Sequence, residues 1–264
     1  NIESHGMGYG KKSLAHRDDY KAAHLIRNQR VVLRDFNHPS VIVWSLGNEA
    51  GHGENFMKTY DLVKSMDLSR PVHYERAEAG PGTDIACPMY FNYENCEKYA
   101  SRTPYPPKPF IQCEYAHAMG NSMGGLKEYW DLIRKYPHYQ GGFIWDWVDQ
   151  AIYDPMEMKQ GIYRLHTGYD YPGPHQGNFC SNGVVSPERQ EGGKLKEVKA
   201  AHQFVEFAMP EVNTEYGIVT IELKNKYNFT NLNEFDVVYD IVKNAWEKEG
   251  VVALVKKTYI KGNL

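Results

Sequence analysis

Two carboxyl groups stand where apolar runs of this sequence end. Asn48 and Glu49 follow the run VIVW at 41–44, and Glu114 lies near the end of KPFIQCEYA at 108–116. An apolar run of this kind favours a buried strand, and a carboxylate that loses water there costs free energy unless it is paired, protonated or used. Two carboxyl groups on separate strand ends suit glycoside hydrolysis. In that reaction one carboxyl group protonates the leaving oxygen, and the other attacks or activates water.

Aromatic and acidic residues accompany the two glutamates at other predicted strand ends. Tyr90 closes TDIACPMY, and Trp145, Asp146 and Asp149 lie in GGFIWDWVDQ. Each has a simpler interpretation, with Tyr90 and Trp145 as packing residues and the two aspartates as capping or ion-paired groups. The convergence of these residues at one face, rather than any single one of them, favours a functional site.

The first six residues, NIESHG, contain a Glu–x–His pair, Glu3 and His5. This pair fits a metal site, and it also fits a surface loop. His52, His117 and His175 each have the same two interpretations, as a ligand or as a structural residue. The residues alone leave both interpretations open.

The elements that would position these side chains alternate along the chain. Apolar spacing predicts helices over 19–36, 54–66 and 126–136, and strands at 41–46, 70–75, 83–90, 108–116 and 141–149. Strands that alternate with helices indicate an α/β fold with a parallel sheet, and in a parallel barrel chemistry occurs at the C-terminal ends of the strands. The connection from 75 to 83 is too short for a crossover helix, which predicts an irregular barrel.

The last third of the chain has a different character. The segments 217–229 and 234–246 alternate apolar and polar residues, with a polar turn at 230–233 between them. A third strand is predicted at 250–260. This pattern predicts the start of an antiparallel, immunoglobulin-like β-sandwich.

Composition excludes several classes of protein. The formal net charge of −3 leaves no basic surface typical of nucleic-acid binding, and no apolar stretch reaches the 18 residues of a membrane span. We therefore expect no nucleic-acid partner and no membrane insertion. Four cysteines without CxxC spacing predict reduced thiols. The composition leaves the compartment open between cytoplasm and periplasm.

Five motifs, in order along the chain, resemble the large bacterial β-galactosidases of glycoside hydrolase family 2. They are NIESHG, RDFNHPSVIVWSLGNEAGHG, CEYAHAMGNS, GGFIWDWVDQ and FCSNG. The resemblance extends from residue 1 to about 207, and after Glu211 only the sandwich pattern continues it. It implies a hydrolase that cleaves terminal β-D-galactosides with retention, through a covalent galactosyl-enzyme intermediate.

The resemblance also implies catalytic roles for three residues. Glu49 matches the general acid/base, and Glu114 matches the nucleophile. Tyr90 matches the tyrosine that donates a hydrogen bond to the nucleophile. The carboxyl groups of a retaining pair lie about 5–5.5 Å apart.

Substrate and metal sites follow from the same motifs. The resemblance implies that Asn48, His117, Trp145 and Asn182 contact the sugar, with Trp145 as the floor of the galactose subsite. It implies a Mg²⁺ ion held by Glu3, His5 and Glu49. It also implies a Na⁺ ion held by the Phe179 carbonyl and Asn182.

The resemblance further implies that the chain is a fragment. The family places its Glu–x–His near the end of the third barrel strand, so we expect residues 1–197 to form a partial (β/α)8 TIM barrel that lacks its first strands. Residues 198–264 would begin the β-sandwich domain. We expect little activity from the fragment alone and a homo-oligomer for the full-length enzyme. The alternatives are an inactive galactose-binding or interaction fragment, or a relative of the β-glucuronidases or β-mannosidases, against which NIESHG and CEYAHAMGN argue.

Overall fold

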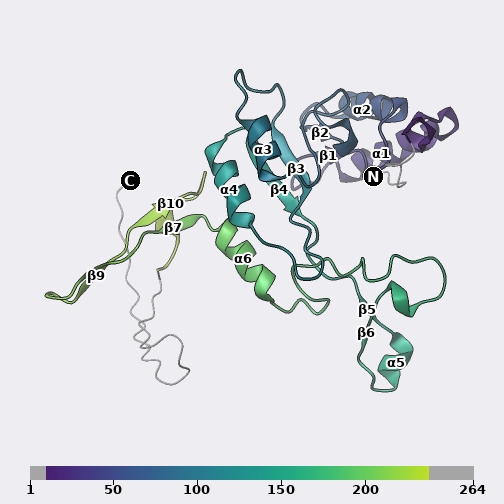
Figure 1. Ribbon diagram of the computed structural model, residues 1–264. Coiled ribbons are helices and arrows are strands. Elements are labelled where there is room, and N and C mark those ends of the chain that lie inside the picture. Colours follow the sequence, from purple (N-terminus) through teal and green to yellow (C-terminus); the bar gives the residue numbers. More distant parts are fainter. Residues whose placement is uncertain (1–9, 238–264) are drawn as a thin grey trace. The chain divides into compact units, whose positions relative to one another are not determined.

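The computed structural model describes residues 10–237, and Figure 1 shows their helices and strands. Glu3 and His5 lie outside the described residues, as do the predicted strand at 250–260 and most of that at 234–246. The predicted roles of these residues therefore stay predictions.

Two compact units make up the chain, Asn1–Ala201 and His202–Leu264. Helix α6 (Gly193–His202) runs across residues 197 and 198, where the sequence analysis placed the domain boundary. The described residues of the predicted site all belong to the first unit. Among the described helices, none combines the length and the apolar composition that crossing a bilayer requires.

Short parallel strands form the framework of the first unit. They are β1 (Trp44–Ser45), β2 (Val72–His73), β3 (Phe110–Tyr115) and β4 (Tyr139–Ile144). β1 pairs with β2, and β3 pairs with β4, both in parallel. Residues 84–90 join the two pairs. On one side the Asp84 amide donates to the Val72 carbonyl (2.7 Å), and on the other the Ile111 amide donates to the Ala86 carbonyl (3.0 Å).

The resulting order is β1, β2, segment 84–90, β3 and β4, an α/β series of the barrel type that does not close within residues 10–237. The predicted strand at 83–90 appears as isolated parallel bridges at Ala86 and Met89 rather than as a regular strand. Because parallel strands end at the same edge, the residues that follow them gather there.

Helices accompany the strands. They are α1 (Lys21–Asp35), α2 (Glu54–Met66), α3 (Tyr93–Ala100), α4 (Leu126–Lys135), α6 and the short α5 (Pro155–Lys159) beside the β5 (Ile152–Tyr153) and β6 (Leu165–His166) hairpin. α1, α2 and α4 confirm the three predicted helices. The sequence analysis missed α3, which starts where the Asn92 side chain accepts from the Asn95 amide (2.9 Å). It also missed α6, in which only Val198 and Ala201 are buried.

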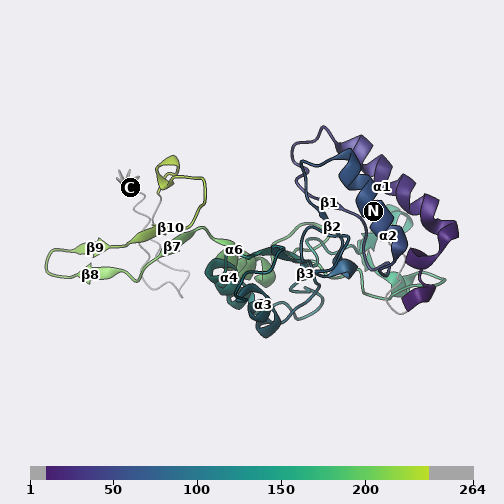
Figure 2. The ribbon, with the colours of Figure 1, turned by 90° about the horizontal axis from the view of Figure 1, so that it is seen from above.

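Buried apolar residues join the helices to the strands. α1 and α2 lie side by side and pack on β1 and β2 through Val32, Phe56 and Trp44 (Figure 2). The Phe56 ring stacks on that of Tyr74 with centroids 3.9 Å apart. Fully burying a side chain such as Phe56 contributes about 1.5–3 kcal/mol. This packing makes the strand ends a rigid base for the residues that follow them.

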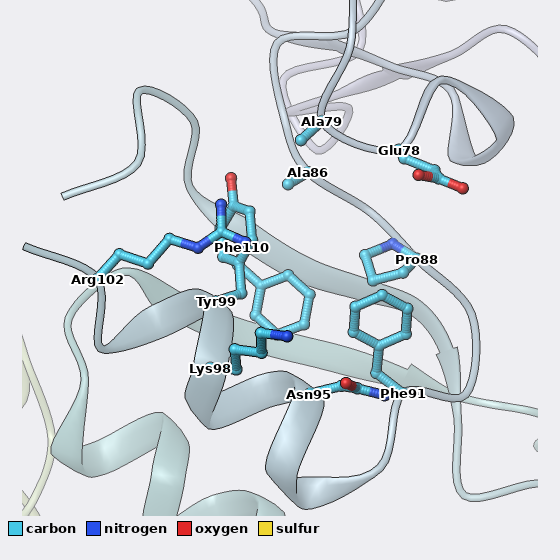
Figure 3. A pocket seen from close by; sticks show the side chains of 10 residues that line it. All are labelled: Glu78, Ala79, Ala86, Pro88, Phe91, Asn95, Lys98, Tyr99, Arg102 and Phe110. Atoms are coloured by element: carbon cyan, nitrogen blue, oxygen red, sulfur yellow. The ribbon is translucent and has the colours of Figure 1, made fainter.

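The connection between β2 and residue 83 contains no crossover helix, as its length predicted. It forms a single 3₁₀ turn, Glu75–Ala77, and then a loop. A cavity of about 280 Å³ lies beside this loop, between Glu78 and the α3 residues Lys98 and Tyr99 (Figure 3). Arg102 also lines it, and its guanidinium lies 5.0 Å from the centroid of the Tyr99 ring. The barrel is thus irregular at this connection.

The described part of the second unit, residues 202–237, contains two antiparallel strand pairs. Its strands are β7 (Val205–Phe207), β8 (Glu211–Asn213), β9 (Ile218–Thr220) and β10 (Leu223–Asn225). β7 pairs with β10 and β8 pairs with β9, so the predicted strand at 217–229 is divided and pairs with upstream residues. The predicted turn at 230–233 instead begins a 3₁₀ turn, because the Asn231 amide donates to the Glu234 carboxylate (3.0 Å). The immunoglobulin-like sandwich stays a prediction.

Candidate active site

A cavity of about 570 Å³ lies at the C-terminal edge of the parallel strands. The ten residues that line it are Asn48, Glu49, Tyr90, Glu114, His117, Trp145, Gln150, Gln176, Phe179 and Asn182. Every predicted site residue within 10–237 is among them. Asn48 and Asn182 line the same cavity although they lie 134 positions apart in the sequence. Glu49, Glu114 and Trp145 meet there because each lies at or just after the end of a parallel strand.

Two hydrogen bonds join Glu114 and Tyr90. The Tyr90 hydroxyl donates to Glu114 Oε2 at 2.6 Å, and the Tyr90 amide donates to the Glu114 carbonyl at 2.9 Å. Burial, followed by the hydrogen bond to Glu114, raises the pKa of Tyr90 well above its usual range. Tyr90 thus remains a proton donor, and a charge-assisted hydrogen bond of this kind stabilises the ionised form of Glu114.

Glu49 occupies a strained turn after β1. Its φ of 48° lies in the left-handed region, which costs a non-glycine residue about 1–3 kcal/mol. Gly51, with φ of 75°, continues the turn. At Gly53 a Cβ atom would lie 2.6 Å from the Ala15 carbonyl oxygen, so the close approach of the two segments requires glycine. The glycines after Glu49 therefore turn the chain sharply and leave its carboxyl group at the cavity.

Glu75 and Arg76 lie behind Glu49. The Glu49 amide donates to Glu75 Oε1 at 2.6 Å, and Arg76 Nε lies 2.9 Å from Glu75 Oε2. Arg76 Nη2 lies 3.6 Å from Glu49 Oε1. Glu75 is only 4% exposed, and this burial raises its pKa to about 7, although Arg76 acts in the opposite direction.

Sequence reasoning missed Glu75, Gln150 and Gln176. For Glu75 the signal was present, because the residue ends the predicted strand RPVHYE as Glu114 and Tyr90 end theirs. Gln150 and Gln176 lie in loops, where neither periodicity nor a strand end indicates a function.

His117 lies between two aromatic rings of the cavity. Its ring centroid is 5.7 Å from that of Tyr90 and 5.6 Å from that of Phe179. Burial lowers the pKa of His117. The neutral imidazole that this favours can both donate and accept a hydrogen bond, which suits contact with hydroxyl groups. The His117 backbone carbonyl accepts from Ser122 Oγ at 2.8 Å, which helps to fix the loop.

Trp145 follows β4 directly and is held by its backbone. The Trp145 amide donates to the Tyr115 carbonyl (3.1 Å), and the Ala118 amide donates to the Trp145 carbonyl (2.7 Å). Asp146 and Asp149 anchor neighbouring backbone instead of lining the cavity. Asp146 accepts from the Trp147 amide, and Asp149 accepts from the Gly183 amide at 2.6 Å. Both aspartates therefore have a structural role, but as acceptors for loop backbone rather than as the capping or ion-paired groups of their simpler interpretation.

Asn182 and Phe179 bring two amide-type oxygens to one side of the cavity. Asn182 Nδ2 donates to the Phe179 carbonyl at 2.5 Å. Asn182 Oδ1 is buried and has no hydrogen-bond partner among the described residues. A buried oxygen that accepts no hydrogen bond costs free energy, and coordination of a small cation by that oxygen would offset the cost. Within residues 10–237 no cluster of three or more His, Cys, Asp or Glu side chains forms a metal site.

Comparison with known proteins agrees with the motifs. The sequence profile of the glycosyl hydrolases family 2 TIM barrel domain matches residues 1–207. A β-galactosidase of Priestia megaterium is 41% identical over 254 residues, which cover 92% of this chain and 24% of that protein. A β-galactosidase of Lactococcus lactis is 39% identical over 269 residues, which cover 94% of this chain and 26% of that protein.

Solved structures support the fold. The FMN-binding β-glucuronidase of Faecalibacterium prausnitzii L2-6 matches 73% of this chain and 34% of its own, with a TM-score of 0.50 and 14% identity. The chain spans about a quarter of the length of the curated relatives given above. The family profile matches most of the residues, and relatives are about 40% identical, so the chain belongs to glycosyl hydrolase family 2, with residues 1–207 matching the TIM barrel domain of that family.

Proposed function

We propose that the protein carrying this chain is a retaining β-galactosidase and that the cavity at the strand ends is its active site. One observation carries this proposal: Glu49 and Glu114 line the same cavity, and Glu114 accepts a hydrogen bond there from Tyr90. The names of the relatives at 41% and 39% identity support galactoside as the substrate class.

The two glutamates would divide the reaction between them. Glu114, which accepts a hydrogen bond from Tyr90, attacks the anomeric carbon as a carboxylate. The bond to the leaving oxygen breaks while Glu49 gives that oxygen its proton. Glu49 then removes a proton from water, which attacks the anomeric carbon and releases Glu114. The two inversions give net retention, and Glu49 ends the cycle protonated, as it began.

The other lining residues would bind the sugar. Asn48 would contact the 2-hydroxyl, and His117 would contact galactose hydroxyls. Trp145 would form an apolar floor for the ring. These assignments follow the family motifs, and the position of all three residues in the cavity supports them.

Two metal ions would complete the site. Glu3, His5 and Glu49 would hold Mg²⁺, and of these Glu49 lies in the cavity as an oxygen donor of the type that Mg²⁺ takes. A divalent ion there would favour the ionised form of Glu49. The unpaired Oδ1 of Asn182 and the Phe179 carbonyl fit Na⁺. We expect His5→Phe to weaken Mg²⁺ binding in the full-length protein about 10–100-fold, measured by calorimetric titration.

Covalent trapping tests the proposed function. Full-length protein is incubated with a 2-fluoro β-galactoside that carries a good leaving group, and the labelled peptide is mapped by mass spectrometry. We expect the label on Glu114, because the fluorine slows hydrolysis of the intermediate. Matched 2-fluoro glucuronide and mannoside serve as controls and should label more slowly. A label on Glu49 or Asp146, or faster labelling by a control sugar, would contradict the proposal.

A further inference from the structure

Glu75 and Arg76 lie in the layer directly behind the cavity rather than among its lining residues. Glu75 is 4% exposed and follows β2, the strand next to the one that leads to Glu49. Its carboxylate accepts from the Glu49 amide at 2.6 Å. A short hydrogen bond from a backbone amide to a buried carboxylate fixes the backbone and not merely the side chain.

The backbone that this bond holds is the strained one. Glu49 has φ of 48°, a conformation that a non-glycine residue keeps only when its surroundings determine it. The bond from Glu75 reaches the amide of the strained residue itself, so it acts where the chain would otherwise relax.

Arg76 connects the two carboxyl groups. Its Nε lies 2.9 Å from Glu75 Oε2, whereas its Nη2 lies 3.6 Å from Glu49 Oε1 and 3.7 Å from the Met89 sulfur. The guanidinium lies within ion-pair distance of both carboxylates, so its positive charge attracts both of them. The longer separation at Glu49 leaves its carboxylate in the cavity instead of in a tight pair with Arg76.

We propose that Glu75 and Arg76 form a positioning pair that holds the backbone and carboxylate of Glu49 in the orientation needed for proton transfer. The proposal rests on the proposed function, because Glu49 is taken as the acid/base. Neither residue lines the cavity, so neither is a catalytic residue. They act through Glu49, and the predicted consequence is a defect in proton transfer rather than in sugar binding.

A pair of substrates with different leaving groups measures this defect. A phenyl β-galactoside needs a proton from Glu49 on its leaving oxygen, whereas a 2,4-dinitrophenyl β-galactoside does not. A displacement of about 1 Å in a catalytic group costs about 10²-fold in rate. In full-length Glu75→Ala we expect kcat/KM to fall about 10²-fold for the phenyl substrate and less than about 5-fold for the dinitrophenyl substrate. Glu75→Gln keeps an oxygen for the Glu49 amide and should recover part of the loss.

Asp67→Asn is the matched control. Asp67 is also 4% exposed and also pairs with an arginine, Arg70, but at the opposite end of β2. It should alter neither the rate of the folded enzyme nor the ratio between the two substrates. Two outcomes would overturn the proposal. One is an equal fall in kcat/KM for both substrates in Glu75→Ala. The other is a change in the ratio of the two kcat/KM values in Asp67→Asn as large as that in Glu75→Ala.

Crystal structures of the full-length wild type and Glu75→Ala, which removes the acceptor of the Glu49 amide, separate this proposal from the proposed function. If the wild type hydrolyses no galactoside, the proposed function fails, and the positioning role is decided by geometry alone. We expect Glu49 to leave the left-handed region, or its carboxylate to move by about 1 Å, in the variant. A Glu49 that keeps its φ and its place without the Glu75 carboxylate overturns the positioning role.

Discussion

The two ends of strand β2 each carry a buried carboxyl group paired with an arginine, and the two pairs differ. At the entry end Asp67 accepts from Trp44 Nε1 (2.9 Å) and Arg70 Nη1 (2.7 Å), and also from the amide and hydroxyl of Ser69. At the exit end Glu75 pairs with Arg76 and accepts from the amide of a residue in the cavity.

The pKa values of the two groups move in opposite directions. Burial acts to raise the pKa of Asp67, but the donors from Ser69, Arg70 and Trp44 outweigh it and hold the pKa well below its usual range. At Glu75 burial dominates and raises the pKa to about 7. At the entry end, hydrogen bonds outweigh the cost of burying the Asp67 carboxylate. At the exit end, next to the cavity, the contacts of Glu75 do not outweigh the cost of its burial. Parallel barrels divide stability and catalysis between their two ends in this way.

The largest expected effect tests the exit end. Glu114→Gln removes the proposed nucleophile, and loss of such a group costs about 10⁴–10⁶-fold in kcat. We expect kcat on an aryl galactoside to fall by at least about 10⁴-fold in the full-length protein. Urea denaturation should be nearly unchanged. A fall in stability as large as that of an entry-end variant would erase the contrast between the two ends.

Tyr90→Phe tests the same end with a smaller change. The substitution removes the hydroxyl that donates to Glu114 at 2.6 Å and leaves the ring beside His117. Removing one hydrogen-bond donor to an oxygen whose charge changes during the reaction lowers kcat about 10²–10³-fold. Steady-state kinetics should show a loss of about 10²-fold in kcat, and a loss confined to KM would instead assign Tyr90 to sugar binding.

Asp67→Asn tests the entry end. It leaves Arg70 without its carboxylate and weakens the bond from Trp44, so we expect a loss of about 1.5–3 kcal/mol of local stability, as for other hydrogen bonds to charged groups. Hydrogen–deuterium exchange over 41–46 and 67–73 measures it. The same exchange in Glu114→Gln is the control. Unaltered exchange in Asp67→Asn would show that the entry pair does not stabilise the strands.

The parts of the fold that the sequence predicted are those with strong periodicity or strand ends. The helix predicted over 54–66 matches α2, because Phe56 and Val63 repeat at helical spacing and are buried. Likewise Glu114 was found because it ends an apolar run, and the run is the buried strand β3.

The parts that were missed depend on local capping or on contacts between distant residues. α3 begins at an Asn92 cap and buries Cys96, Tyr99 and Ala100 at helical spacing, but its eight residues are shorter than the 11–18 residues over which such spacing identifies a helix. The pairing of β8 with β9 depends on which segments meet, and alternation alone does not choose a partner. The bond from the Glu49 amide to Glu75 spans 26 residues and becomes visible only when β1 and β2 are adjacent.

The smallest expected effect concerns pH and again separates the two ends of β2. The folded-state pKa of Asp67 lies below its unfolded value of about 3.9. A group of this kind contributes stability that is complete above the unfolded pKa and is lost as pH falls through the folded pKa. Wild type should therefore lose stability below about pH 4, and Asp67→Asn should lose less of it there. Urea midpoints of both full-length proteins at pH 7, 5, 4 and 3 measure the difference, which should be constant between pH 7 and 5 and should shrink below pH 4. A difference that stays constant down to pH 3 would mean that the charge of Asp67 does not stabilise the entry end.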